Sequence, residues 1–279
     1  MALAMCENAL MREYYFAERG ICYRTNEFQT GRQTLVWIHG LSGSASAWFP
    51  YERIFEKYNL LTFDLRGHGK SGRPKHYEDY GLKECADDVY ELLEHLHIDT
   101  CIIVSHSFGT LIALEFENTY KRKVSALVLL SPTSFLYQIR LHKFVRIAVR
   151  AVISICRILP FRTMRRGRVD YSIFSYTGDW DLRRIVRDIY NTTVHSYIYC
   201  LSQMYAKSYD EDWKRISAPT LIMHGISDGY VPVQNSVRLA NEIPQSELVL
   251  LKGANHIIVL NNIAEVSENI ERFLTSTRS

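Results

Sequence analysis

Short apolar runs recur along the chain and alternate with stretches in which apolar residues follow a helical period. The runs are apolar at almost every position, as in parallel strands that are buried on both faces. Strands that alternate with helices imply a mostly parallel sheet with helices on both faces. We predict strands at 14–17, 21–24, 34–38, 59–63, 101–104, 124–130, 220–223 and 247–251, the first two as an antiparallel hairpin.

The stretch between the strands at 124–130 and 220–223 has a different pattern. Residues 133–215 contain no clear buried strand, and their pattern predicts several helices. We therefore expect a core formed by residues 1–132 and 216–279, with a helical insertion at 133–215. A length of 279 residues fits one large α/β domain that carries such an insertion.

The charge of this insertion is lopsided, because no acidic residue occurs from Asn118 to Val169. Within residues 144–159, Arg146, Arg150 and Arg157 share one face of a predicted helix whose other faces are aliphatic. Two interpretations stay open for this basic amphipathic helix. Either it packs its apolar side on the core, or it touches a membrane surface or an anionic amphiphile.

Composition narrows the classes of protein and the compartment. Hydrophobic residues make up 47% and charged residues 23%, which is ordinary for a soluble enzyme, and a net charge of +3 does not indicate a nucleic-acid binder. The six cysteines are scattered, which argues against a disulfide framework or a zinc site and for reduced thiols in a cytoplasmic protein. The N-terminal residues lack the pattern of a secretory signal, and no apolar run is long enough to span a membrane.

The clearest candidate for chemistry lies where the strand at 101–104 ends. Ser105-His106-Ser107-Phe108-Gly109 follows the strand at once, and a helix-compatible run begins at Thr110. A serine at a sharp turn from strand to helix is a nucleophile elbow, in which the hydroxyl stands clear of its own backbone. The usual pattern has glycine two residues before the serine, where this chain has Ser105. That departure concerns the packing of the turn.

Two polar residues follow later strands. Asp228 lies in the loop after the strand at 220–223, and His256 lies in the loop after the strand at 247–251. Because the carboxyl ends of parallel strands share one edge of a sheet, we expect both side chains to meet Ser107 there. His256 can accept the serine proton, and Asp228 can orient the imidazole and stabilise its positive charge.

With these landmarks the chain resembles the α/β-hydrolase superfamily over nearly its whole length. The resemblance is carried by five landmarks in this order: His39-Gly40-Leu41, then Asp64-Leu65-Arg66-Gly67-His68-Gly69-Lys70-Ser71, the elbow at Ser107, Asp228 and His256. It implies an α/β-hydrolase fold with a mostly parallel eight-stranded sheet, helices on both faces, and the insertion as a cap or lid. Departures from the family pattern are Ser105 and Thr110.

The resemblance also implies roles for individual residues. The backbone amides of Leu41 and Phe108 would form the oxyanion hole, which receives the negative charge of the tetrahedral intermediate. His39, Gly40 and His106 are expected near the substrate, with His39 also as a hydrogen-bonding residue of its loop. Asp64 and His68 are expected to be structural. No metal and no organic cofactor is implied.

The residue at the elbow sorts the superfamily by chemistry. Dehalogenases and epoxide hydrolases that resemble this chain have aspartate there, so Ser107 argues against both. The expected function is a serine hydrolase that cleaves carboxylic esters, with a preference for lipid-like esters such as a monoacylglycerol or a lysophospholipid. Two alternatives use the same triad, namely carbon–carbon bond hydrolysis and cofactor-free perhydrolysis. An alternative of another class is a non-catalytic ligand receptor.

Overall fold

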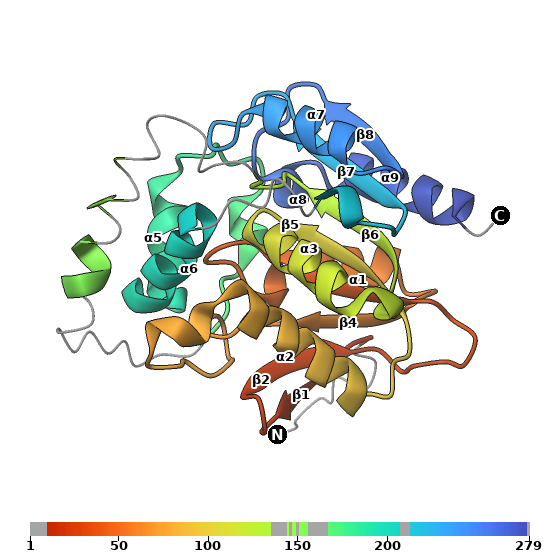
Figure 1. Ribbon diagram of the computed structural model, residues 1–279, viewed down its shortest axis with the longest axis horizontal. Coiled ribbons are helices and arrows are strands. Elements are labelled where there is room, and N and C mark those ends of the chain that lie inside the picture. Colours follow the sequence, from red (N-terminus) through yellow and green to blue (C-terminus); the bar gives the residue numbers. More distant parts are fainter. Residues whose placement is uncertain are drawn as a thin grey trace, which may run out of the picture.

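An eight-stranded sheet forms the centre of the molecule (Figure 1). The computed structural model describes residues 10–134, 144, 147, 148, 151–155, 167–206 and 213–277. The strand order is β1-β2-β4-β3-β5-β6-β7-β8; β2 runs antiparallel to β1 and β4, and the pairs from β4 to β8 are parallel. The strands are β1 (Arg12–Phe16), β2 (Ile21–Thr25), β3 (Thr34–Ile38), β4 (Asn59–Phe63), β5 (Cys101–His106), β6 (Val124–Leu130), β7 (Thr220–Gly225) and β8 (Ser246–Leu251).

Helices cover both faces of this sheet, and the strand sequences show why. Alternate side chains of a strand point to opposite faces, so the fully apolar strand β3 sends Val36 to one face and Leu35 and Trp37 to the other. The first face packs against α2 (Leu82–His95), α3 (Phe108–Tyr120) and α7 (Val233–Glu242). The second packs against α1 (Phe49–Ile54), α8 (Ile258–Asn261) and α9 (Ile263–Ser276).

The predicted architecture is confirmed. Eight strands stand at the eight predicted places, and β3, β4 and β6 have the predicted bounds. The hairpin of β1 and β2 is antiparallel. The strands β5 and β7 run about two residues further than predicted, because the polar residues at their carboxyl ends, such as Ser105 and His224, still pair within the sheet.

Between β6 and β7 the described residues contain short helices and no strand. They include η5 (Tyr171–Phe174), α5 (Leu182–Thr192), α6 (Val194–Ala206) and η6 (Trp213–Arg215). Figure 1 shows α5 and α6 side by side, to one side of the sheet. The arrangement agrees with a helical insertion, but the division into a core and a cap at residues 133–215 stays a prediction.

The predicted basic helix at 144–159 is only partly described. Residues 151–155 are helical, but Arg146, Arg150 and Arg157 lie outside the described residues. Phe144, Ile147 and Ile155 are exposed, while Ile153 is buried. Among the residues that the structure describes, no helix is long and apolar enough to cross a membrane.

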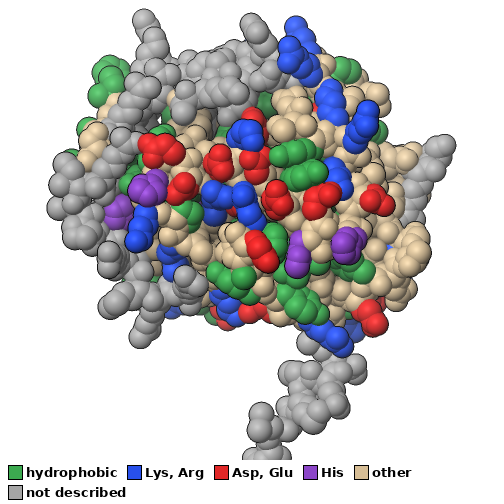
Figure 2. Space-filling model, turned by 60° about the horizontal axis from the view of Figure 1, so that its bottom comes forward, with side chains coloured by type: hydrophobic (Ala, Val, Ile, Leu, Met, Phe, Trp, Pro, Cys, Tyr) green, Lys and Arg blue, Asp and Glu red, His purple; other side chains and the backbone are tan. Residues whose placement is uncertain are grey.

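Charged side chains on the face that carries α2 alternate in sign (Figure 2). Lys83 pairs with Asp87 of the same helix at 2.6 Å, and Arg19 reaches Asp88 at 2.8 Å. Such mixed pairs agree with the small net charge of the chain. Four cysteines are free and buried, namely Cys22, Cys85, Cys101 and Cys200, while Cys6 and Cys156 lie outside the described residues.

Candidate active site

The turn between β5 and α3 has the geometry of a nucleophile elbow. Ser107 has φ 50° and ψ −119°, a left-handed backbone that a residue with a side chain rarely adopts. Small neighbours make room for it. A side chain at Gly109 would place its Cβ 2.6 Å from the backbone oxygen of His39, and one at Gly40 would come 3.2 Å from the Ser107 Cβ. Ser105 is fully buried and donates its hydroxyl to the Val128 oxygen at 3.3 Å, so serine fits this position.

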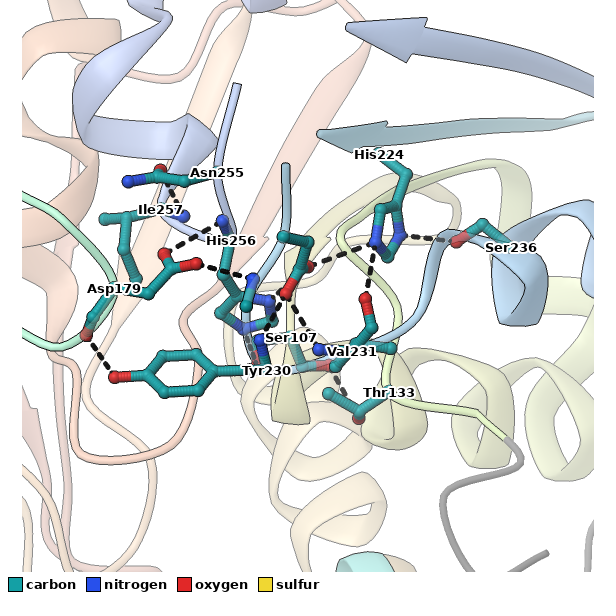
Figure 3. Close-up of polar contacts among 12 residues, drawn as sticks. Ser107, Thr133, Asp179, His224, Tyr230, Val231, Ser236, Asn255, His256 and Ile257 are labelled. Atoms are coloured by element: carbon teal, nitrogen blue, oxygen red, sulfur yellow. Dashed lines mark hydrogen bonds and ion pairs between the residues drawn. The ribbon is translucent and has the colours of Figure 1, made fainter. Parts of the chain in front are cut away.

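The structure brings Ser107, Asp228 and His256 together (Figure 3). The Nε2 atom of His256 lies 2.8 Å from the Ser107 Oγ, and its Nδ1 atom lies 2.7 Å from Oδ2 of Asp228. The three side chains come from the loops after β5, β7 and β8. The arrangement lets the imidazole accept the serine proton on one nitrogen while the carboxylate holds the other.

Asp228 is held as a carboxylate by donors on several sides. Its Oδ1 accepts the backbone N–H groups of Tyr230 and Val231, both at 2.8 Å. Its Oδ2 lies 3.1 Å from Nε2 of His224, in addition to its contact with His256. Burial by itself raises the pKa of Asp228, but the hydrogen bonds from His224 and His256 outweigh it and hold that pKa well below its usual range.

The proposed oxyanion donors lie beside the serine. Phe108 is the first residue of α3, where a helix leaves its amides without intrahelical partners. Leu41 follows Gly40, whose backbone passes against both Ser107 and the ring of His106. Neither amide donates a backbone hydrogen bond outside the regular elements among the described residues. Their role as oxyanion donors stays a prediction.

Four further polar residues were named in the sequence analysis and lie near the loops of the site, namely His39, Asp64, His68 and His106. His106 and Gly40 line the cavity above Ser107, and Nε2 of His106 lies 3.0 Å from the His256 backbone oxygen. His39 does not line it. The ring of His39 is fully buried and accepts the Leu65 amide at 3.0 Å, so the geometry does not support a substrate contact. Asp64 and His68 are buried as well. Asp64 accepts loop amides of Ala45 and Lys70, and His68 accepts the Ser42 amide.

A cavity of about 490 Å³ opens above Ser107 and His256. One part of its wall is apolar and is formed by residues such as Leu201, Met204 and Leu260. Tyr171, Tyr197 and Tyr205 also line it. Of the other aromatic residues in this stretch of the chain, Phe174 and Tyr199 pack in the core, and Tyr176 and Tyr190 are exposed. Among the described residues no cluster of three metal-ligating side chains is found.

Several residues at the site were missed by the sequence analysis. Arg184 and Asp188 of α5 line the cavity as a buried pair at 3.3 Å, and the Tyr171 hydroxyl donates to Asp188 at 2.8 Å. Asp179 lies between the loops of Asp228 and His256. None of them belongs to a motif. The sequence contains one feature that could have pointed to them. Acidic residues reappear after the acid-free stretch, at Asp170, Asp179, Asp181 and Asp188.

Comparisons with known proteins identify the family and the fold. Residues 33–263 match the family model described as the alpha/beta hydrolase fold. A Caenorhabditis elegans protein named epoxide hydrolase 1 is 26% identical over 278 residues, which cover 90% of this chain and 68% of the relative. A proline iminopeptidase from Pestalotiopsis fici is 26% identical, with 81% of this chain and 84% of the relative covered. The crystal structure of an esterase from Rhodococcus aligns with a TM-score of 0.69 at 20% identity, over 96% of this chain and 100% of that one, and thus shares its fold.

Proposed function

Because this chain belongs to the alpha/beta-hydrolase family, we propose that it is a serine hydrolase that cleaves carboxylic esters through an acyl-enzyme. The observation that carries the proposal is the hydrogen-bonded series Ser107–His256–Asp228 beneath a cavity. The proposed nucleophile argues against epoxide hydrolysis, the activity in the name of the nematode relative. Residue 107 is serine, whereas epoxide opening in related enzymes uses an aspartate.

The distances support the following mechanism. Oγ of Ser107 attacks the acyl carbonyl carbon while Nε2 of His256, 2.8 Å away, takes its proton. The tetrahedral oxyanion lies against the backbone amides of Leu41 and Phe108 in this proposal. Collapse expels the alcohol, which receives the proton from His256. A water molecule, deprotonated by His256, then attacks the acyl-enzyme and releases the acid, and Ser107 regains its proton.

We propose a lipid-like ester as the substrate, with residues 133–215 as the cap that forms its pocket. The apolar wall at Leu201, Met204 and Leu260 supports this choice, since an acyl chain gains free energy by leaving water. The outward face of α5 supports contact with a lipid surface, because Leu182, Val186 and Tyr190 are exposed on it. Monoacylglycerols and lysophospholipids have the single acyl chain that such a pocket fits.

The test is hydrolysis of para-nitrophenyl esters of increasing acyl length, with Ser107→Ala beside the wild type. We expect activity that is lost in the variant, with thermal unfolding unchanged, and an optimum at long acyl chains. Ester hydrolysis that survives in Ser107→Ala would exclude this residue as the nucleophile. No turnover of any ester would move the assignment to carbon–carbon hydrolysis, perhydrolysis or ligand reception, which ring-cleavage substrates, peroxide with acetate, and equilibrium binding would separate.

A further inference from the structure

A buried carboxylate from the insertion stands between the two loops that carry the acid and the base of the site. Asp179 precedes α5 in the chain, and only 6% of it is exposed. Its Oδ2 accepts the backbone N–H of Gly229 at 2.7 Å, one residue after Asp228. Its Oδ1 accepts the backbone N–H of His256 itself at 3.0 Å. One side chain thus joins the acid loop to the base loop (Figure 3).

The backbone of Asp179 makes a third connection to the site. Its carbonyl oxygen accepts the hydroxyl of Tyr230, and the ring of Tyr230 packs edge-on against the imidazole of His256 at 5.1 Å and 77°. The ring is therefore fixed at its hydroxyl end and packs in a T-shaped arrangement against the imidazole of His256. In this way Asp179 acts on both the backbone of His256 and the side chain that limits the tilt of its ring.

The segment around Asp179 is itself fixed. The side-chain amides of Asn255 and Asn261 both donate to the Thr177 oxygen at 2.9 Å, and Nη2 of Arg184 donates to the Asp179 oxygen at 2.7 Å. A carboxylate that braces two loops can hold them only if its own backbone does not move. These contacts meet that condition.

We propose that Asp179 is a positioning residue of the triad, which holds the loops of Asp228 and His256 at the spacing that proton transfer requires. The proposal rests on the serine-hydrolase function proposed above. Asp179 touches neither the serine nor the acyl group, and it acts through His256. Displacement of a general base by a fraction of an ångström weakens its hydrogen bond to the nucleophile, and a misplacement of about 1 Å can cost about a hundredfold in rate.

The decisive variant is Asp179→Asn, which keeps the size of the side chain. Its amide oxygen can accept one of the two backbone N–H groups, while its NH2 group faces the other. We expect kcat on a soluble para-nitrophenyl ester to fall about tenfold to a hundredfold, with KM changed by less than about threefold. Labelling of Ser107 by a fluorophosphonate should slow in parallel, because that reaction also depends on the placement of His256.

Asp181→Ala is the matched control. Asp181 lies two residues away and also accepts two backbone N–H groups, but they belong to Arg183 and Arg184 at the start of α5. Its loss weakens the same segment without touching either triad loop. A proton NMR spectrum adds a direct view, since the Nδ1 proton between His256 and Asp228 should shift or broaden in Asp179→Asn and stay in place in Asp181→Ala.

The outcomes separate this inference from the proposed function. If Ser107→Ala is inactive and Asp179→Asn matches Asp181→Ala in kcat, labelling and NMR, Asp179 is not a positioning residue. If Ser107→Ala remains active, the function itself is overturned. Thermal unfolding is measured for each variant, and the asparagine variant decides because it replaces the buried carboxylate with a group of the same shape.

Discussion

At the scale of single residues, the elbow depends on an absent side chain. Ser107 can hold φ 50° because α3 begins close against the end of β3, and that contact is made at Gly109. A Cβ there would stand 2.6 Å from the His39 oxygen and 2.7 Å from the Ile38 oxygen, both backbone atoms that cannot turn aside. The glycine therefore serves the approach of helix and strand.

Replacing Gly109 with alanine should change the stability of the fold in two opposing ways. Gly109→Ala should gain up to about 1 kcal/mol from helix propensity, yet we expect a net loss of about 1–3 kcal/mol because the added methyl group overpacks the contact. Urea unfolding measures the difference. Gly81→Ala is the control, since its Cβ would meet its nearest neighbour at an ordinary 3.5 Å. An unchanged midpoint in Gly109→Ala would show that helix and strand can separate without cost.

The same scale shows what the sequence could and could not reveal about the site. Ser107, Asp228 and His256 were predicted to meet because each follows a predicted strand, and parallel strands end at one edge. Asp179 follows no strand. It reaches the site only through the path of the insertion, which depends on tertiary contacts such as Asn255 to Thr177. Periodicity carries no information on such contacts.

At the scale of elements, α5 is turned opposite to its apolar pattern. Apolar periodicity alone would bury Leu182 and Val186, yet 72% and 64% of these residues are exposed. The inward positions are held by Arg184 and Asp188, which pair with each other at 3.3 Å. Burial raises the pKa of Asp188 to about 6, against the opposing effect of its hydrogen bond from Tyr171. The helix thus directs the charged pair Arg184 and Asp188 toward the cavity and exposes apolar side chains to solvent.

This orientation leads to a test of contact with lipid surfaces. Leu182→Ser combined with Val186→Ser should lower binding to phosphatidylcholine–phosphatidylserine vesicles at least about tenfold, because two side chains no longer leave water. Activity on a soluble short-chain ester should be kept. Tyr14→Ser with Tyr15→Ser removes two exposed side chains of β1 and serves as control.

The basic residues of the insertion provide a second arm of the same experiment. Vesicle binding should weaken with added salt, and also when Arg146 and Arg150 are neutralised together, since salt screens the attraction between basic side chains and an anionic surface. Wild-type protein that does not sediment with vesicles would rule out the membrane contact. The cavity above Ser107 would then be filled from solution.

At the scale of the whole molecule, the turns at the carboxyl edge enclose three neutral histidines. Burial lowers the pKa of His39 to about 4, and burial, helped by a neighbouring histidine in each case, lowers the pKa values of His68 and His106 to about 3. The unfolded chain takes up protons at these groups below about pH 6.5, and the folded chain does not. Their contribution to stability is full above that pH and is lost as the pH falls toward 4.

The measurable quantity is the slope of the unfolding free energy against pH. Half-buried Glu52 and buried Asp188 act in the opposite sense, because burial raises their pKa values to about 7 and about 6. The prediction therefore concerns a difference between variants. His68→Gln should reduce the slope between pH 6 and 5 by about 1.4 kcal/mol per pH unit. His76→Gln, which changes an exposed ring, is the control. Equal slopes in both variants would mean that His68 is not held neutral.

The central sheet could be predicted from the sequence more fully than the helices between β6 and β7. The central strands are apolar at nearly every position because both faces of the sheet are covered, and this pattern is legible along the chain. The short helices η5, α5 and α6 enclose a cavity, and their inward faces carry Tyr171, Arg184, Asp188 and Tyr197. Because polar residues of these helices face the cavity, burial does not follow hydrophobicity there. The apolar pattern of the sequence alone could therefore not predict which face of each helix points inward.

The loop that carries His256 follows β8, which is an edge strand and the last strand of the sheet in sequence. A ribosome must therefore add 149 residues after Ser107 before His256, the proposed base, has been made. At about 5–20 residues per second this takes many seconds. Throughout that time the nascent chain holds the proposed nucleophile without its proposed base. Under the proposed function, the chain would therefore not act on acyl groups near the exit tunnel, and activity would begin only after the last strand has been made.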